Sequence, residues 1–128
     1  MNLKLEKWHK CNVDKEVLKE LSKKSDLKGL QHVSVFFSLL FLTGILAYQT
    51  WGTWWSVFWF LVYGNIYSFS NPLWHETGHK TAFQSKFLNE FFYYISSYMA
   101  NFEPIRWRST HFVHHGNTYS TENPFDHE

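Results

Sequence analysis

Cysteine is almost absent from this sequence, and an excess of either charge is absent as well. Cys11 is the single cysteine among the 128 residues, so an internal disulfide framework is excluded. The formal net charge is only +1, and a chain without a basic excess is not expected to bind nucleic acid. The first sixteen residues are charged throughout and lack the apolar core of a secretory signal peptide. Insertion into a membrane is therefore expected to depend on internal apolar spans.

Charged residues are also missing from a long internal stretch. From Gly29 to His75, 47 consecutive residues include no Asp, Glu, Lys or Arg. A single helix of that length would run roughly 70 Å, over twice the ~30 Å hydrocarbon core of a bilayer. Two spans, at about 33–48 and 54–70, joined by a turn at Gln49–Thr53, fit better. The alternative is a buried hairpin in a soluble all-α core, although soluble helices rarely continue so far without a charge.

These patterns divide the chain into three segments. Residues 1–31 are polar and rich in Lys, and an amphipathic helix is expected over about residues 14–24. Residues 32–71 contain the membrane hairpin, and residues 72–128 carry two clusters of histidine. The predicted fold class is therefore all-α, with a membrane helical hairpin followed by cytoplasmic or interfacial helices.

Asparagine and proline suggest where the helices after the hairpin begin. Asn71 is a good N-cap and Pro72 a good first helical residue, which predicts a helix over about 72–83. Two further helices are expected, one over 87–102, ended by Pro104, and one from Ile105 to Gly116.

Basic residues flank the hairpin at both ends, whereas the turn between its spans has no charge. Under the positive-inside rule this places both termini and the histidine clusters on the cytoplasmic side of an integral membrane protein. The lysines concerned are Lys15, Lys19, Lys23, Lys24 and Lys28 before the first span, and Lys80 and Lys86 after the second.

The two histidine clusters have the spacing of metal ligands. His75 and His79 lie at i and i+4, so both project from one helix face. His111, His114 and His115 combine i+3 and i+4 spacing, so three more imidazoles can converge. Imidazole binds Zn, Fe, Cu and Ni, which leaves the metal open. Five histidines exceed the needs of one tetrahedral zinc ion and indicate two ions or a larger shared site.

Carboxylates near these clusters have two possible roles. A metal-binding histidine usually donates its second ring N–H to a carboxylate or carbonyl, and Glu76, Glu103 and Asp126 are candidates for that partner. The segment His75–His79 also fits the H-E-x-x-H pattern of zinc metalloproteases, in which Glu76 would be the general base. That pattern is short, and the second cluster offers more histidines than a protease requires.

The pair HETGH and HFVHH, with RWRST before the second, resembles the membrane fatty acid desaturase family. That family carries one histidine box after its first membrane hairpin and an H-x2-H-H box some thirty-odd residues later. Here the boxes begin at His75 and His111, in the contexts NPLWHETGHKTAF and WRSTHFVHHGNT, which most resemble bacterial members. The segment LKELSKKSDLKGL before the first span is similar to their N-terminal region, so the resemblance covers about residues 13–126.

The resemblance implies a chemistry and a set of partners. The five histidines would be ligands of two non-haem irons at the cytoplasmic membrane face. With O₂ and electrons from a ferredoxin or cytochrome-b5-type donor, such a centre would oxidise the acyl chain of a lipid. The family also has a third histidine box after a further pair of apolar spans, and these 128 residues include neither. We therefore expect this chain to be a fragment with an incomplete di-iron site, inactive alone.

Three other functions remain open at this stage. A lipid or carotenoid hydroxylase of the same superfamily uses similar boxes. A membrane zinc protease would use the H-E-x-x-H pattern, and an inactive metal-binding relic would keep the histidines without the reaction.

Overall fold

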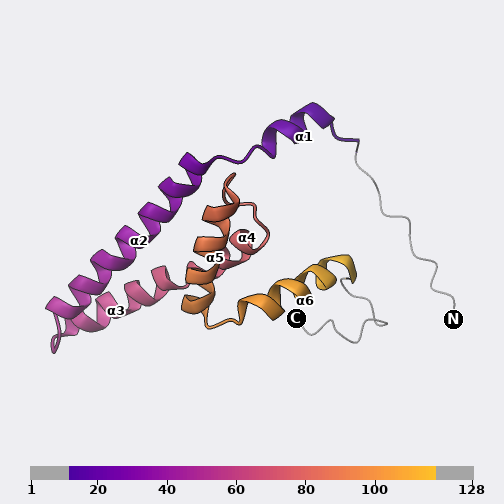
Figure 1. Ribbon diagram of the computed structural model, residues 1–128. Coiled ribbons are helices and arrows are strands. Elements are labelled where there is room, and N and C mark those ends of the chain that lie inside the picture. Colours follow the sequence, from indigo (N-terminus) through magenta and orange to yellow (C-terminus); the bar gives the residue numbers. More distant parts are fainter. Residues whose placement is uncertain (1–11, 118–128) are drawn as a thin grey trace.

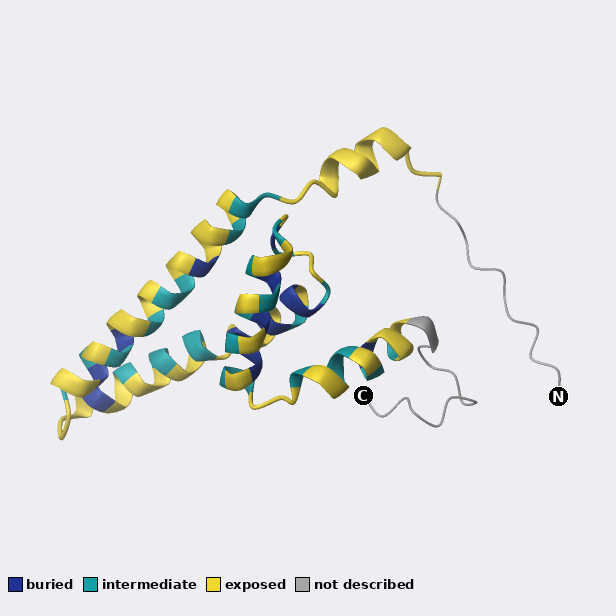
Figure 2. Ribbon diagram, in the orientation of Figure 1, coloured by how far each residue is buried: buried dark blue, intermediate teal, exposed yellow. Residues whose placement is uncertain are grey.

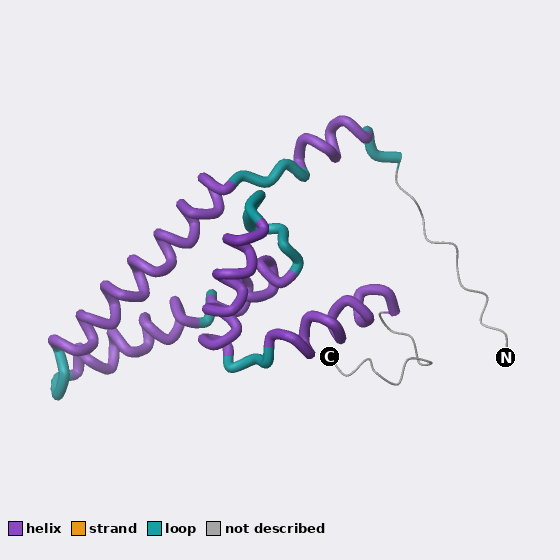
Figure 3. Tube along the Cα trace, in the orientation of Figure 1, coloured by secondary structure: helices purple, strands orange, loops and turns teal. Residues whose placement is uncertain are grey.

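The computed structural model describes residues 12–117, and within this range every regular element is a helix (Figure 3). The predicted all-α fold class is therefore confirmed. The helices are α1 (Lys15–Leu21), α2 (Asp26–Gln49), α3 (Trp54–Tyr67), α4 (Ser70–Gly78), α5 (Lys86–Ala100) and α6 (Pro104–Asn117).

Helices α2 and α3 form an antiparallel hairpin along one side of the molecule (Figure 1). The α2 helix begins where the Ser25 hydroxyl accepts a hydrogen bond from the Lys28 amide, and its 24 residues span about 36 Å at the standard helical rise. Among the described residues it is the one helix long and apolar enough to cross a membrane. The α3 helix has 14 residues, about 21 Å, and is shorter than the second span that the sequence predicted.

Small residues let the two helices of the hairpin approach each other. Thr43, Ala47 and Ser56 are buried, and a Cβ placed on Gly44 would lie 3.3 Å from the Tyr63 ring. The Thr43 hydroxyl donates to the Leu39 carbonyl at 2.8 Å, so burial leaves no unpaired polar group there. The contact therefore depends on side-chain size and internally satisfied hydroxyls.

Large apolar side chains cover the outside of the hairpin. Phe41 is 73% exposed and Leu61 71% exposed, and Figure 2 shows exposed residues along most of both helices. Soluble monomers rarely expose contiguous apolar surface on this scale. The hairpin thus presents a surface that an apolar environment would stabilise.

The junction between α3 and α4 differs from the sequence prediction. The α4 helix begins at Ser70 after Phe69, so Asn71 is not the N-cap and Pro72 is not the first helical residue. The first-turn amides of a helix have no intrahelical acceptor, and a proline there removes no helical hydrogen bond. Pro72 is therefore accommodated inside the first turn, and α4 follows α3 after a short break.

The α4 helix also ends earlier than predicted, at Gly78. Lys80 adopts a left-handed conformation with φ of 59°, and the Thr81 amide donates to the Glu76 carbonyl at 3.0 Å. Together with the bond from the Lys80 amide to the Thr77 carbonyl, this is a Schellman motif that ends the helix. The chain then turns toward α5 and places Phe83, which is fully buried, against Asn89.

The main core lies where α4 and α5 pack together, as the dark residues in Figure 2 show. Tyr93 and Ser97 of α5 are buried, as are Trp74 and Thr77 of α4. A second left-handed residue, Asn101, ends α5, and Glu103 then starts α6 by accepting the amides of Ile105 and Arg106. The turn points α6 back toward α4, so segments far apart in the sequence meet.

Candidate metal centre

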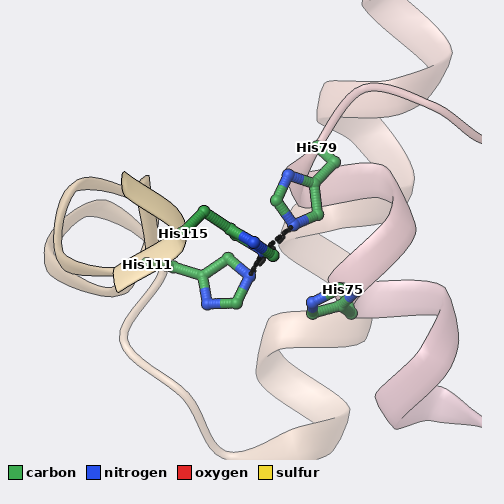
Figure 4. A group of neighbouring side chains, drawn as sticks. All are labelled: His75, His79, His111 and His115. Atoms are coloured by element: carbon green, nitrogen blue, oxygen red, sulfur yellow. Dashed lines mark hydrogen bonds between the residues drawn. The ribbon is translucent and has the colours of Figure 1, made fainter. Parts of the chain in front are cut away.

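Four histidines from two helices gather at one place. His75 lies in α4 and His79 is the residue that directly follows this helix, whereas His111 and His115 come from α6 (Figure 4). Each offers one ring nitrogen, and these four atoms all lie within 4.8 Å of one another. His111 is buried, His75 and His79 are half-buried, and His115 is exposed. The group is therefore placed to bind a metal ion.

In three of the four rings, the Nε2 atoms point toward one another. The Nε2 atoms of His79 and His111 are 2.9 Å apart. Those of His111 and His115 are 3.0 Å apart, and those of His115 and His79 are 3.2 Å apart. The three nitrogens thus form a nearly equilateral triangle, and the His75 ring stands against it at 4.7 Å from the His79 ring and 4.8 Å from the His111 ring.

Protons alone cannot satisfy all three sides of this triangle. A nitrogen of a neutral imidazole either donates its N–H or accepts with its lone pair. Each side of the triangle needs one donor nitrogen and one acceptor nitrogen. Because each of the three nitrogens has only one of these roles, at least one side must join two donors or two acceptors. A cation bound to all three nitrogens removes the conflict, because every nitrogen then presents its lone pair to the same ion.

The dimensions of the triangle also fit a metal ion. Metal-to-imidazole bonds are about 2.1 Å, so two ligands at right angles lie ~3.0 Å apart and two tetrahedral ligands ~3.4 Å apart. The observed separations of 2.9, 3.0 and 3.2 Å are nearer the right-angled value. The group therefore resembles one face of an octahedron, a geometry that leaves positions for other ligands.

Desolvation and neighbouring charge favour the unprotonated form of one of these ligands. Burial lowers the pKa of His79, and the neighbouring His75, His111 and His115 lower it further because their positive forms would repel a second cation. A neutral ring has a free lone pair. The electrostatics of the cluster therefore favour the protonation state that binds metal.

A stack of aromatic rings fixes the second box against the first. The Trp107 ring lies parallel to the His111 ring at 4.3 Å and meets Trp74 at 3.8 Å. Trp74 in turn stacks on Phe102, with ring centroids 4.2 Å apart. Because Trp107 is one helical turn before His111 and Trp74 directly precedes His75, the stack joins α6 to α4 beside the nitrogens.

Comparison with known proteins places this site in a family. The profile described as Fatty acid desaturase matches residues 49–128, which is more than half of the chain and includes all four histidines. The chain belongs to the fatty acid desaturase family. No curated protein matches this desaturase-family chain, and no solved structure matches it.

The fifth histidine that the sequence singled out lies beside the cluster. The ring of His114 is 5.9 Å from the rings of both His111 and His115, and His114 is not one of the four whose ligand atoms gather. In an α-helix, positions i+3 and i+4 are separated by about 100° around the axis. The side chains of His114 and His115 therefore leave α6 in different directions, and it is the His115 Nε2 atom that approaches His79.

Two of the three carboxylates named from the sequence lie within the described residues. Glu76 lines a cavity beside α2, and Glu103 caps the first amides of α6. Asp126 falls outside the described residues. Glu76 and Glu103 are not members of the group of four histidines, and their role as partners of a second ring N–H stays a prediction.

The sequence interpretation missed an ionic contact that supports this desaturase-family centre. Glu90 of α5 accepts hydrogen bonds from Arg108 of α6, and the Arg108 guanidinium lies 4.0 Å from the centre of the Tyr93 ring. The Tyr93 hydroxyl donates to the Pro104 carbonyl, at the start of α6. The RWRST segment contained the available signal, because Arg108 precedes His111 by one turn and would share its side of the helix.

Proposed function

We propose that this chain contributes to a membrane di-iron centre that uses O₂ to introduce a double bond into the acyl chain of a lipid. Membership of the fatty acid desaturase family supports the reaction class. The observation that carries the proposal is the triangle of Nε2 atoms from His79, His111 and His115, with His75 beside it. These residues suit an iron ion by ligand type and by their near right-angled spacing.

The chain's own residues would bind and orient the metal. His75, His79, His111 and His115 would hold it, and His114 would be a ligand of a second ion. Bound iron with O₂ supplies an oxidant strong enough for an unactivated C–H bond, which side chains alone cannot provide. Trp107 would keep the His111 ring in one orientation by stacking, and the lowered pKa of His79 favours the neutral form of its ring.

The surroundings of the site support a lipid substrate. The apolar outer faces of α2 and α3 would lie in a bilayer, and α4 carries the first box directly after α3. The lysines before α2 and after α4 favour the cytoplasmic side for this end of the hairpin. There, the centre would receive electrons from a soluble or membrane donor of the ferredoxin or cytochrome-b5 type.

The first test measures metal binding by the purified chain in detergent. Cobalt(II) reports imidazole coordination through its visible spectrum. We expect saturable binding that falls at least tenfold in affinity in His79→Ala and His111→Ala, since each loses a ligand. His9→Ala is the matched control and should bind as the original chain does. Equal binding by all four proteins would refute the ligand assignment.

The second test asks whether the centre oxidises lipid. His111→Ala is introduced at the chromosomal gene, and fatty acids of the source cells are measured by gas chromatography and mass spectrometry. We expect loss of an unsaturated fatty acid in His111→Ala and no change in Glu76→Gln. Loss of a hydroxylated lipid instead would assign the centre to a hydroxylase. An unchanged lipid profile, with metal still bound by the original protein, would contradict an enzymatic role.

A further inference from the structure

The cavity that Glu76 lines lies beside α4, away from the four clustered histidines. Its volume is about 620 Å³, and it is an open cavity lined by the first half of α2, the junction of α3 with α4, and the loop after α4. None of the four clustered histidines lines it. Leu73 and Glu76 of α4 face this cavity, so α4 separates it from the candidate metal centre.

The lining changes from basic to apolar along α2. Lys23, Lys24 and Lys28 lie at one end, and Phe36 and Leu39 lie further along the helix. The helical rise places Leu39 roughly 16 Å beyond Lys28. Ile66 of α3 and Phe69, which precedes α4, also line the cavity. The cavity is therefore amphipathic along the axis of the hairpin, as a phospholipid is along its length.

The basic end carries more positive than negative charge. Three lysine ammonium groups line it, against the single carboxylate of Glu76. The Lys24 ammonium donates to the Lys80 carbonyl at 2.7 Å, which holds one of these charges against the loop after α4. The nearby Asp26 carboxylate accepts a hydrogen bond from the Ser85 amide and is absent from the lining. An anionic headgroup that carries hydroxyls could therefore pair its charge with the lysines and donate hydroxyl hydrogen bonds to Glu76.

We propose that this cavity binds one anionic phospholipid, with its phosphodiester at Lys23 and Lys28 and one acyl chain along Phe36, Leu39 and Ile66. Basic pockets at the cytoplasmic ends of membrane helices commonly hold anionic headgroups. This inference rests on the membrane placement in the proposed function, but it concerns a lipid that is not the substrate. The bound lipid would fix α2 against the loop that follows His79.

The test measures thermal unfolding of the purified chain in detergent with added phosphatidylglycerol. We expect the midpoint to rise in a saturable way. In Lys23→Gln/Lys28→Gln the lipid concentration needed for half of that rise should increase by roughly thirtyfold. The matched control is Lys15→Gln/Lys19→Gln, which removes two charges from α1, outside the cavity, and should respond as the original chain does. Lys28→Gln alone serves if the double variant does not fold.

Three comparisons can overturn the inference. Equal stabilisation by phosphatidylcholine would show that the headgroup charge is not recognised. Equal stabilisation by inorganic phosphate would show that the apolar half is not used. An unchanged response in the lysine variants would place the lipid elsewhere. Cobalt titration of the same sample separates the two proposals. If the original chain binds cobalt but is not stabilised by phosphatidylglycerol, only the phospholipid proposal is refuted. If it is stabilised by the lipid but does not bind cobalt, only the metal centre is refuted.

Discussion

Glu90 accepts two hydrogen bonds from the Nη1 atom of Arg108, each 3.0 Å long, and so ties α5 to α6. The same carboxylate lies 3.3 Å from the Lys80 ammonium. Lys80 directly follows His79, and Arg108 lies three residues before His111. One carboxylate therefore connects the segments that carry the two histidine boxes.

Glu90→Gln should weaken metal binding without removing a ligand. The amide keeps the size of the side chain but loses the charge that holds Lys80 and Arg108, so α6 should dock less firmly. We expect cobalt(II) affinity to fall by roughly tenfold, the lower end of effects from residues that support a ligand. Glu20→Gln on exposed α1 is the control and should leave the affinity unchanged. An affinity equal to that of the original chain would show that Glu90 does not position α6.

The Glu90 contact should also make stability depend on pH. Burial opposes ionisation of Glu90, but hydrogen bonds and charge from Arg108 and Lys80 outweigh it and lower the pKa below its usual value of 4.5. The contribution of Glu90 to stability is therefore complete above pH 4.5, the usual pKa. It is lost as the pH falls through the lower pKa that Glu90 has in the folded protein. In thermal unfolding below pH 4.5, the original chain should lose more stability than Glu90→Gln. Parallel curves for the two proteins would contradict this prediction.

Gly78→Ala should disturb the packing under the metal centre. A Cβ at residue 78 would lie 2.8 Å from the Trp107 ring and 3.1 Å from the Tyr93 ring. Because Trp107 supports His111, we expect a loss of about 1–3 kcal/mol of folding free energy and weaker metal binding. Gly64→Ala in α3 is the matched control, since a Cβ there meets no atom within 4 Å. Denaturant unfolding should leave that control unchanged or slightly stabilised.

His79 should stay neutral at lower pH than an ordinary histidine. Burial, followed by the charges of His75, His111 and His115, lowers the pKa of His79 from its usual value of 6.5. As the pH falls, His79 binds a proton in the unfolded chain before it does so in the folded protein. The metal-free protein should therefore lose stability between pH 6.5 and the lower pKa that His79 has in the folded state. Nuclear magnetic resonance of the ring, assigned with His79→Gln, should give a midpoint below 6.5. A midpoint above that value would contradict the prediction.

Local patterns in the sequence predicted the helices and the shared faces of the histidine boxes. Spacing of i and i+4 places His75 with His79, and His111 with His115, whatever the rest of the chain does. The same rule left His114 equivalent to His115, because the choice between them depends on how α6 is rotated toward α4. That rotation is set by Trp107 and other contacts between distant segments, which spacing does not reveal.

Helix ends were harder to predict than helix existence. Pro72 indicated a helix start, yet a first turn accepts proline at more than one position. The end of α4 depends on Lys80 in a left-handed conformation, which costs a residue with a Cβ roughly 1–2 kcal/mol. Lysine is not a usual signal for that conformation. Its partners, Glu90 and the Lys24 ammonium on its carbonyl, become visible only in three dimensions.

The convergence of α4 and α6 on one group of nitrogens has a consequence for maturation. An ion held by His79 and His111 would join positions 32 residues apart in the chain. A covalent cross-link closing a loop of that length stabilises a fold by about 4 kcal/mol through lost chain entropy. If a metal ion acts as such a cross-link, the folding of this half of the molecule would depend on the supply of that metal. Cells starved of the metal would then lose folded protein along with activity.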